Sequence, residues 1–236
     1  MKYTCCRHLL GGITFFFNEI RACCSNNRGI TFENGYNGEK IFDVAKMKAY
    51  REKVVEDCKN GIIPERCKGC VELAEKEWSE KPLIDEIYLL HWDHCNCGCV
   101  YCLQSNHGEF LLKEPKKSRF YDVYPVLKEI YAENLVSKDV YFEIVGGDLT
   151  VLKESDDIIN LVIDNGVGRM SFHSSVIGYS KGIERALKEC NCDFDFSLDC
   201  GDRELYKKIK RIDAFDQAVG NLKKYLACSP SAPNKL

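Results

Sequence analysis

A regular alternation of strand-like and helix-like segments constrains the fold of this chain more than any other feature. From residue 84 onward, four apolar, β-rich segments are each followed by a segment of helical character. The four segments are "DEIYLLHW" (85–92), "DVYFEIVGG" (139–147), "RMSFHSS" (169–175) and "DFDFSLD" (193–199). Strands that alternate with helices pair in parallel through right-handed crossovers. The sequence therefore predicts an α/β fold whose ligands bind beyond the carboxyl ends of the strands.

The helical segments carry their own end signals. "SDDIINLVIDNG" begins with the candidate N-cap Ser155, has acidic residues in its first turn and stops at Gly166. "SKGIERALKE" (180–189) and "DAFDQAVGNLKKYLA" (213–227) repeat the helical period of apolar residues. Each of these predicted helices follows a predicted strand, and the first two can connect it to the next strand.

The N-terminal part of the chain has a different composition. It predicts a hairpin around "ITFFFNEIRACC" (13–24), a helix over "FDVAKMKAYREKVVEDCKNG" (42–61) and the turn-rich "IPERCKGC" (63–70). We therefore divide the chain into a cysteine-rich α+β module (1–82), the α/β domain (83–228) and a disordered tail (229–236).

The 15 cysteines require the redox compartment to be considered first. The apolar run "LLGGITFFF" is interrupted by paired glycines and followed by charged residues, which disfavours a secretory signal. No apolar run approaches the ~20 residues of a spanning helix. We expect a cytoplasmic protein whose clustered cysteines bind metal. The net charge of -3 gives no reason to propose a nucleic acid or a membrane as partner.

The stretch "HWDHCNCGCVYC" (91–102) is the candidate metal site. Cys95, Cys99 and Cys102 have the spacing C-x3-C-x2-C, and Tyr101 precedes the last thiol. A short loop with three thiolates can hold three irons of a four-iron cluster and leave the fourth open to a substrate or cofactor. We interpret Cys97 as a small buried thiol that is not a ligand.

Two other interpretations of these cysteines remain. His107 or Cys97 could complete a structural zinc site with the three thiols. The three cysteines would also share one face of an unbroken helix and could simply be core, although Gly98 favours a loop.

The cysteine spacing in this βα context resembles the cluster loop of radical S-adenosylmethionine (radical SAM) enzymes. "GGD" (146–148) is similar to that family's Gly-Gly-Glu motif, and residues 197–225 resemble the fourth strand and following helix of its peptide-modifying subgroup. The resemblance implies a partial (β/α) barrel of radical SAM type, of which about four βα units are present. It also implies a [4Fe-4S] cluster and S-adenosyl-L-methionine as cofactors.

The resemblance further implies site residues and partners. The implied cofactor-binding residues are Tyr101 near the adenine, Gly146, Gly147 and Asp148 at the methionyl end, and Ser197 and Asp199 near the ribose or methionyl end. Asp148 stands where the family has glutamate, and Ser174 and Ser175 stand where it often has Thr and Asn. The implied reaction is reductive cleavage of the cofactor to a 5'-deoxyadenosyl radical that acts on a peptide or small-molecule substrate. A reductase or a flavodoxin/ferredoxin-type protein would supply the electron.

The N-terminal cysteines form a second candidate metal site. Cys67 and Cys70 have the C-x2-C spacing of a metal knuckle, and the hairpin would add one of Cys5 or Cys6 and one of Cys23 or Cys24. The arrangement resembles SPASM/twitch-type auxiliary-cluster modules. An iron–sulfur cluster, zinc and no metal all remain open. The remaining cysteines and His173 are interpreted as packing or rim residues.

The family's barrel has six strands, whereas the sequence predicts four. We therefore expect a fragment, a shortened family member, or a chain whose barrel a partner completes.

Overall fold

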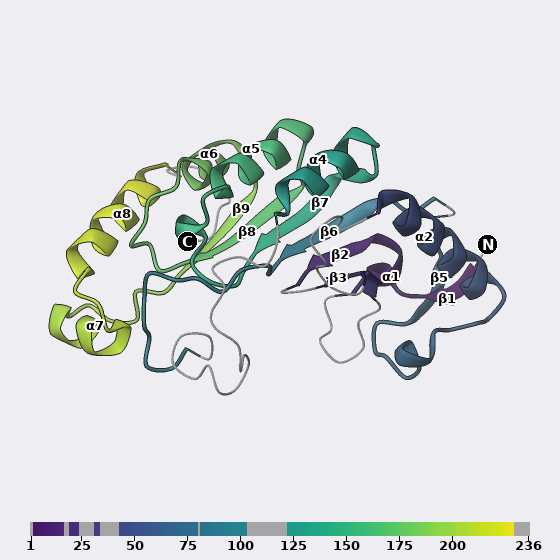
Figure 1. Ribbon diagram of the computed structural model, residues 1–236, viewed down its shortest axis with the longest axis horizontal. Helices are drawn as coiled ribbons and strands as arrows, with labels where there is room; N and C mark the ends of the chain where they lie inside the picture. The colour runs from purple at the N-terminus through teal and green to yellow at the C-terminus, as the bar shows by residue number, and fades with distance from the viewer. Residues whose placement is uncertain are drawn as a thin grey trace.

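The computed structural model describes residues 2–16, 19–23, 31–33, 43–79, 81–102 and 122–228. For residues 31–33 it describes the backbone alone. In these residues the main element is a seven-stranded sheet with the order β4-β3-β2-β6-β7-β8-β9. A two-stranded sheet of β1 and β5 stands apart from it. Figure 1 shows the larger sheet as a curved layer with helices along its outer side.

The four predicted strands and their parallel pairing are confirmed. They are β6 (Ile84–Leu89), β7 (Val136–Ile144), β8 (Arg169–Ser174) and β9 (Cys192–Phe196). Each pairs in parallel with the next, as in Ile87↔Phe142 and Phe172↔Phe194. All four carboxyl ends therefore lie on one edge of the sheet.

The predicted helices are confirmed as well, with small differences at their ends. They are α5 (Ser155–Asn165), α6 (Lys181–Glu189) and α8 (Phe215–Cys228), and two further helices are α4 (Tyr124–Ala132) and α7 (Arg203–Lys210). Ser155 is the first helical residue and Glu154 the N-cap, so the predicted cap is wrong by one residue. Gly166 ends α5 with φ of 92°, a conformation that favours glycine.

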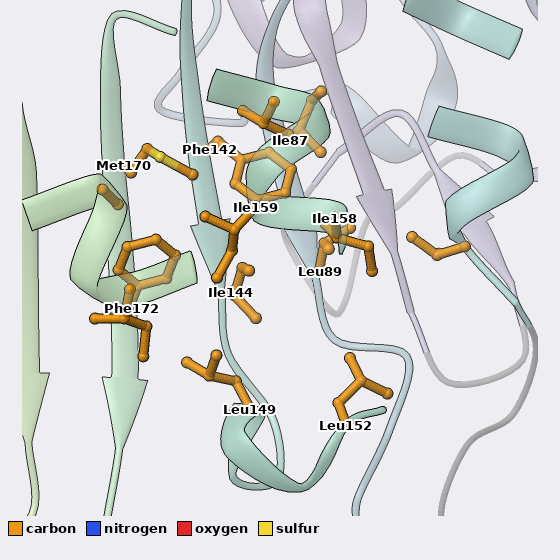
Figure 2. Close-up of a cluster of buried hydrophobic side chains, with 14 of the residues drawn as sticks. Ile87, Leu89, Phe142, Ile144, Leu149, Leu152, Ile158, Ile159, Met170 and Phe172 are labelled. Atoms are coloured by element: carbon orange, nitrogen blue, oxygen red, sulfur yellow. The ribbon is translucent and has the colours of Figure 1, made fainter. Parts of the chain in front are cut away.

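The core lies between the sheet and these helices. Figure 2 shows side chains of β6, β7 and β8 gathered against those of α5, with Leu149 and Leu152 below them. Phe142, Phe172 and Ile159 are fully buried in it. Burying one such side chain stabilises the fold by about 1.5–3 kcal/mol. The packing between strands and helices therefore holds the carboxyl ends of the strands in place.

The N-terminal elements join the same sheet. The predicted hairpin is confirmed as β2 (Gly12–Phe15) paired antiparallel with β3 (Ile20–Arg21), and β4 (Thr31–Glu33) continues it. β2 also pairs in parallel with β6, a fifth parallel strand that the sequence analysis did not anticipate. The sheet thus runs across residue 82, and the proposed division into domains remains a prediction.

The other N-terminal elements form a second, smaller core. β1 (Lys2–Cys5) pairs antiparallel with β5 (Ala74–Glu77), next to α1 (Arg7–Gly11), α2 (Val44–Lys59) and the short helix η1 (Glu65–Cys67). The predicted helix α2 is confirmed, and Asp43 caps it by accepting hydrogen bonds from the amides of Ala45 and Lys46. This core includes Leu9, Leu10, Val54 and Val55.

None of the helices in the described segments is long and apolar enough to cross a bilayer.

Candidate functional site

The segments that follow the four parallel strands line one pocket of about 170 Å³. The residues around it come from the loop after β6, the end of β7, the end of β8, the start of the loop after β9, and α7. They are Cys95, Cys97, Cys99, Tyr101, Cys102, Gly146, Gly147, Asp148, His173, Ser174, Ser175, Ser197 and Lys210. The fold therefore brings together the cysteine triplet, the glycine pair and Ser197, which lie up to about a hundred positions apart in the sequence.

The cysteine loop is irregular, as Gly98 predicted. Residues 90–102 contain no helix or strand, which removes the interpretation of the three cysteines as one face of an unbroken helix. The loop is fixed by backbone hydrogen bonds to the end of α7, from the Gly98 amide to the Lys210 carbonyl and from the Val100 amide to the Ile209 carbonyl, each 2.9 Å. These bonds also satisfy carbonyls that a helix C-terminus leaves without partners.

The glycine pair allows β7 to end directly against the cysteine loop. Gly146 has φ of 125°, and a Cβ there would lie 2.8 Å from the Trp92 carbonyl oxygen. A Cβ on Gly147 would lie 1.9 Å from the His94 carbonyl oxygen, which is a clash with backbone. Both positions therefore require glycine, one for conformation and space and the other for space alone.

Asp148 is a structural acceptor as well as a pocket residue. Its side chain is 2% exposed, and its carboxylate accepts hydrogen bonds from the amides of Thr150 (2.9 Å) and Ser175 (2.6 Å). The hydroxyls of Thr150, Ser174 and Ser175 donate to it as well. The carboxylate thus ties the end of β7 to the end of β8.

The thiols of the cysteine loop interact with one another. The side chain and the amide of Cys97 both donate to Cys95, with 3.4 Å from the amide nitrogen to Sγ, and lower the pKa of Cys95 to about 7. Cys97 is buried, in agreement with its interpretation as a buried thiol, and it also lines the pocket. A thiol with a lowered pKa is readily available as a thiolate, the form that binds metal.

Three thiolates on one short loop beside a pocket are a donor set suited to an iron–sulfur cluster. Within the described residues, no three cysteine, histidine or carboxylate side chains already converge on a common point that could hold a metal ion. The assignment of a cluster therefore depends on the spacing of the cysteines, their chemistry and the pocket beside them.

Tyr101, Asp199 and Lys210 form a hydrogen-bonded triangle at the side of the pocket. The Tyr101 hydroxyl donates to Asp199 Oδ2 at 2.5 Å, and Lys210 Nζ lies 2.8 Å from the same oxygen and 3.0 Å from the Tyr101 hydroxyl. Partial desolvation together with the bond to Asp199 raises the pKa of Tyr101 to about 12, although the residue as a whole is 56% exposed. Although burial lowers the pKa of Lys210, its bonds to Asp199 and Tyr101 raise it further, so the lysine carries its charge.

His173 is a rim residue, as the sequence analysis favoured. Its side chain is 45% exposed, with Nε2 3.3 Å from Glu143 Oε1 and Nδ1 3.7 Å from Asp195 Oδ2. The hydrogen bond to Glu143 raises the pKa of His173, against the effect of burial. The imidazole is one of the side chains that line the pocket.

Four of the N-terminal cysteines, Cys5, Cys6, Cys58 and Cys67, are buried in the smaller core. Cys5 and Cys58 are buried with their sulfurs 3.0 Å apart. Burial raises the pKa of Cys67 to about 11, and the charges of Cys23, Cys6, Cys70 and Cys58 raise it further. Cys24, His107 and residues 229–236 fall outside the described residues, so the predictions that involve them are untested.

Sequence reasoning missed Lys210. A signal for it was present, because Lys210 follows Tyr206 by four positions and so shares the inward face of α7 with that fully buried ring.

Comparison with known proteins identifies one family. The model of the radical SAM superfamily matches residues 89–230, more than half of the 236-residue chain. No curated protein sequence matches the chain.

Several solved structures are similar at low identity. The crystal structure of Streptococcus suis SuiB matches with 16% identity and a TM-score of 0.47, over 81% of this chain and 38% of its own. SuiB bound to S-adenosylmethionine matches with 15% identity and a TM-score of 0.48, over 80% and 39%. SuiB bound to the precursor peptide SuiA matches with 16% identity and a TM-score of 0.47, over 83% and 39%.

This chain therefore spans about two-fifths of the length of those structures. The family match covers the cysteine loop, the glycine pair and all the elements that follow them. The chain belongs to the radical SAM superfamily.

Proposed function

We propose that this chain is a radical SAM enzyme that holds a [4Fe-4S] cluster through Cys95, Cys99 and Cys102 and binds S-adenosyl-L-methionine beside it. When bound, these groups supply reductive cleavage of the cofactor's carbon–sulfur bond and a radical that abstracts hydrogen. The observation that carries the proposal is the single pocket shared by the three thiols and the glycine pair.

The residues around the pocket have separate tasks in this proposal. Gly146 and Gly147 would let the backbone after β7 pack directly against the cysteine loop, and so hold it at the edge of the pocket beside the thiols. Asp148 would hold that backbone in place through its bonds to Thr150 and Ser175. Its carboxylate is occupied by these donors, so its contribution would be positioning. This also fits its shorter reach compared with the family's glutamate.

Tyr101, Ser197 and Asp199 would contact the cofactor. Tyr101 and Ser197 line the pocket, and Asp199 is one hydrogen bond away from Tyr101. A hydroxyl and an aromatic ring can orient a ribose and an adenine by hydrogen bonding and stacking. The substrate would be a peptide or a small molecule, as the resemblance of residues 197–225 to the peptide-modifying subgroup suggests.

Four N-terminal thiols would hold a second metal. Cys6, Cys67, Cys70 and either Cys23 or Cys24 would provide a four-thiolate set. Cys70 donates its amide to the Cys67 carbonyl at 3.0 Å in the tight turn between them. Four thiolates suit both an auxiliary iron–sulfur cluster and zinc. Cys5 is the weaker candidate because its thiol faces Cys58.

The first test is metal and sulfide analysis of protein purified without air. About four irons with equal sulfide would support the catalytic cluster alone, and about eight would support both clusters. Zinc at the catalytic loop with no iron would instead favour the alternative function, a zinc-binding structural or interaction module.

The second test is cofactor cleavage. The reduced wild-type protein should convert S-adenosyl-L-methionine to 5'-deoxyadenosine, whereas Cys99→Ala should not, because one iron loses its ligand. Cys190→Ala is the matched control, since Cys190 lies at the end of α6 outside both thiol groups. Cleavage by Cys99→Ala at the wild-type rate would reject the assigned ligand, and a wild-type protein with iron but no cleavage would be an inactive relative.

A further inference from the structure

Lys210 is buried beside the cysteine loop. It is the last residue of α7, and it is 1% exposed, which is rare for a lysine. Its ammonium bonds to Asp199 at 2.8 Å and to the Tyr101 hydroxyl at 3.0 Å. Removing a lysine from water is costly, so the fold retains this charge only because both partners compensate for it.

The same residue holds the cysteine loop in two ways. Its carbonyl accepts the Gly98 amide at 2.9 Å, and its ammonium reaches the loop again through Tyr101. The next residue, Arg211, adopts a left-handed conformation with φ of 55° and ends the helix there. The C-terminal end of α7 is thus the support on which the loop between Cys95 and Cys102 rests.

The positive charge of the Lys210 ammonium lies beside the thiols of the pocket. Lys210 lines the same pocket as the three predicted ligands, so its ammonium would attract the thiolates of a cluster held there. In a buried site such an interaction is much stronger than in water. Reduction adds negative charge to a thiolate-bound cluster, so a fixed positive charge nearby favours the reduced form.

We propose that Lys210 is a positioning residue that fixes the cysteine loop through Tyr101 and its own carbonyl, and that its ammonium raises the reduction potential of the cluster held by that loop. This inference rests on the proposed function. A residue outside the cysteine motif would thereby help to set the reduction potential of the cluster.

The test uses two substitutions with opposite effects on charge. Lys210→Met removes the positive charge. Asp199→Asn removes the neighbouring negative charge, and asparagine tolerates the left-handed conformation of that position, where φ is 67°. Lys208→Met is the control, because Lys208 is exposed on the same helix.

The measurement is a redox titration of the cluster followed by electron paramagnetic resonance, without added cofactor, on the full chain with its iron content determined. Lys210→Met should lower the equilibrium constant for one-electron reduction about tenfold, which is about 59 mV. Asp199→Asn should shift it in the opposite direction, and Lys208→Met should leave it unchanged. If Lys210 and Asp199 had only structural roles, their substitutions would not shift the potential in opposite directions.

Each outcome decides the inference. If iron-loaded Lys210→Met has the wild-type potential, the role of the charge is wrong. If Lys210→Met does not retain iron, Asp199→Asn decides alone: an upward shift supports the inference and an unchanged potential overturns it. A wild-type chain that takes up no iron would overturn the proposed function and this inference with it, whereas iron uptake with equal potentials overturns the inference only.

Discussion

Replacing Asp148 by alanine should destabilise the whole site. The carboxylate is 2% exposed and accepts hydrogen bonds from two backbone amides and three hydroxyls at the ends of β7 and β8. Alanine would leave these donors buried without an acceptor. Each unsatisfied amide costs about 1–3 kcal/mol, and the hydroxyls can rotate to other partners in part. We therefore expect the free energy of unfolding to fall by about 3–5 kcal/mol.

The assay is urea unfolding followed by far-ultraviolet circular dichroism. With a slope of about 2–3 kcal/mol per molar urea, the midpoint should fall by about 1–2.5 M. Asp148→Asn keeps one carbonyl acceptor and should lose less stability than Asp148→Ala. The control is Asp157→Asn, at an exposed position in the first turn of α5, with an expected loss below about 1 kcal/mol. A midpoint of Asp148→Ala within error of the wild type would refute the view that this carboxylate joins the two strands.

Three further predictions test other parts of the structure. Gly147→Ala should lower the affinity for S-adenosyl-L-methionine at least about tenfold and the stability by about 1–3 kcal/mol, because its Cβ would clash with backbone; equilibrium dialysis and urea unfolding measure these effects. The hydrogen bond between His8 and Glu86, 2.5 Å long, raises the pKa of His8 above its ordinary value of 6.5. Its contribution to stability is therefore complete below about pH 6.5 and is lost as the pH rises through the higher pKa of the folded state. Urea midpoints from pH 6 to 8.5 should show this decline in the wild type and a smaller decline in His8→Gln, which keeps only the contribution of His173 and Glu143. Phe142→Ala should cost about 3–5 kcal/mol in the same assay, whereas Leu205→Ala, at a position 47% exposed, should cost less than about 1 kcal/mol.

The strands and helices after residue 83 could be predicted because their signals are local. The alternation of apolar and polar residues in β8, for example, and the end of α5 at Gly166 can each be recognised from a few consecutive residues. The pairing of β2 with β6 could not be predicted in this way, because the two strands are about 70 positions apart in the sequence. All four residues of β2 are buried and only Thr14 is polar, and a near-continuous apolar run is typical of a strand inside a parallel sheet. That signal was present, but the adjacent hairpin explained it equally well.

The candidate site was predictable in its backbone features and less so in its side-chain network. The cysteine spacing and "GGD" stand at the ends of predicted parallel strands, and such ends meet at one edge, so their shared pocket follows from topology. The bonds of Asp148 to Ser175 and of Lys210 to Asp199 depend on rotamers and on segments far apart in the sequence. The sequence also does not distinguish Lys210 from the exposed lysines next to it except by its position on the helix.

The pattern within the strands explains why a reactive group at the pocket would face polar side chains. In β8, the apolar residues Met170 and Phe172 are buried in the core. The polar residues Arg169, Ser171 and His173 alternate with them on the other face, where Ser171 is buried as well. A parallel sheet covered by helices on both faces would have apolar residues throughout its strands, so this alternation indicates a sheet covered on one face only. Figure 1 shows α4, α5, α6 and α8 along one side of the curved sheet. The other face therefore carries charged and polar groups up to the pocket, whose lining includes His173, paired with Glu143.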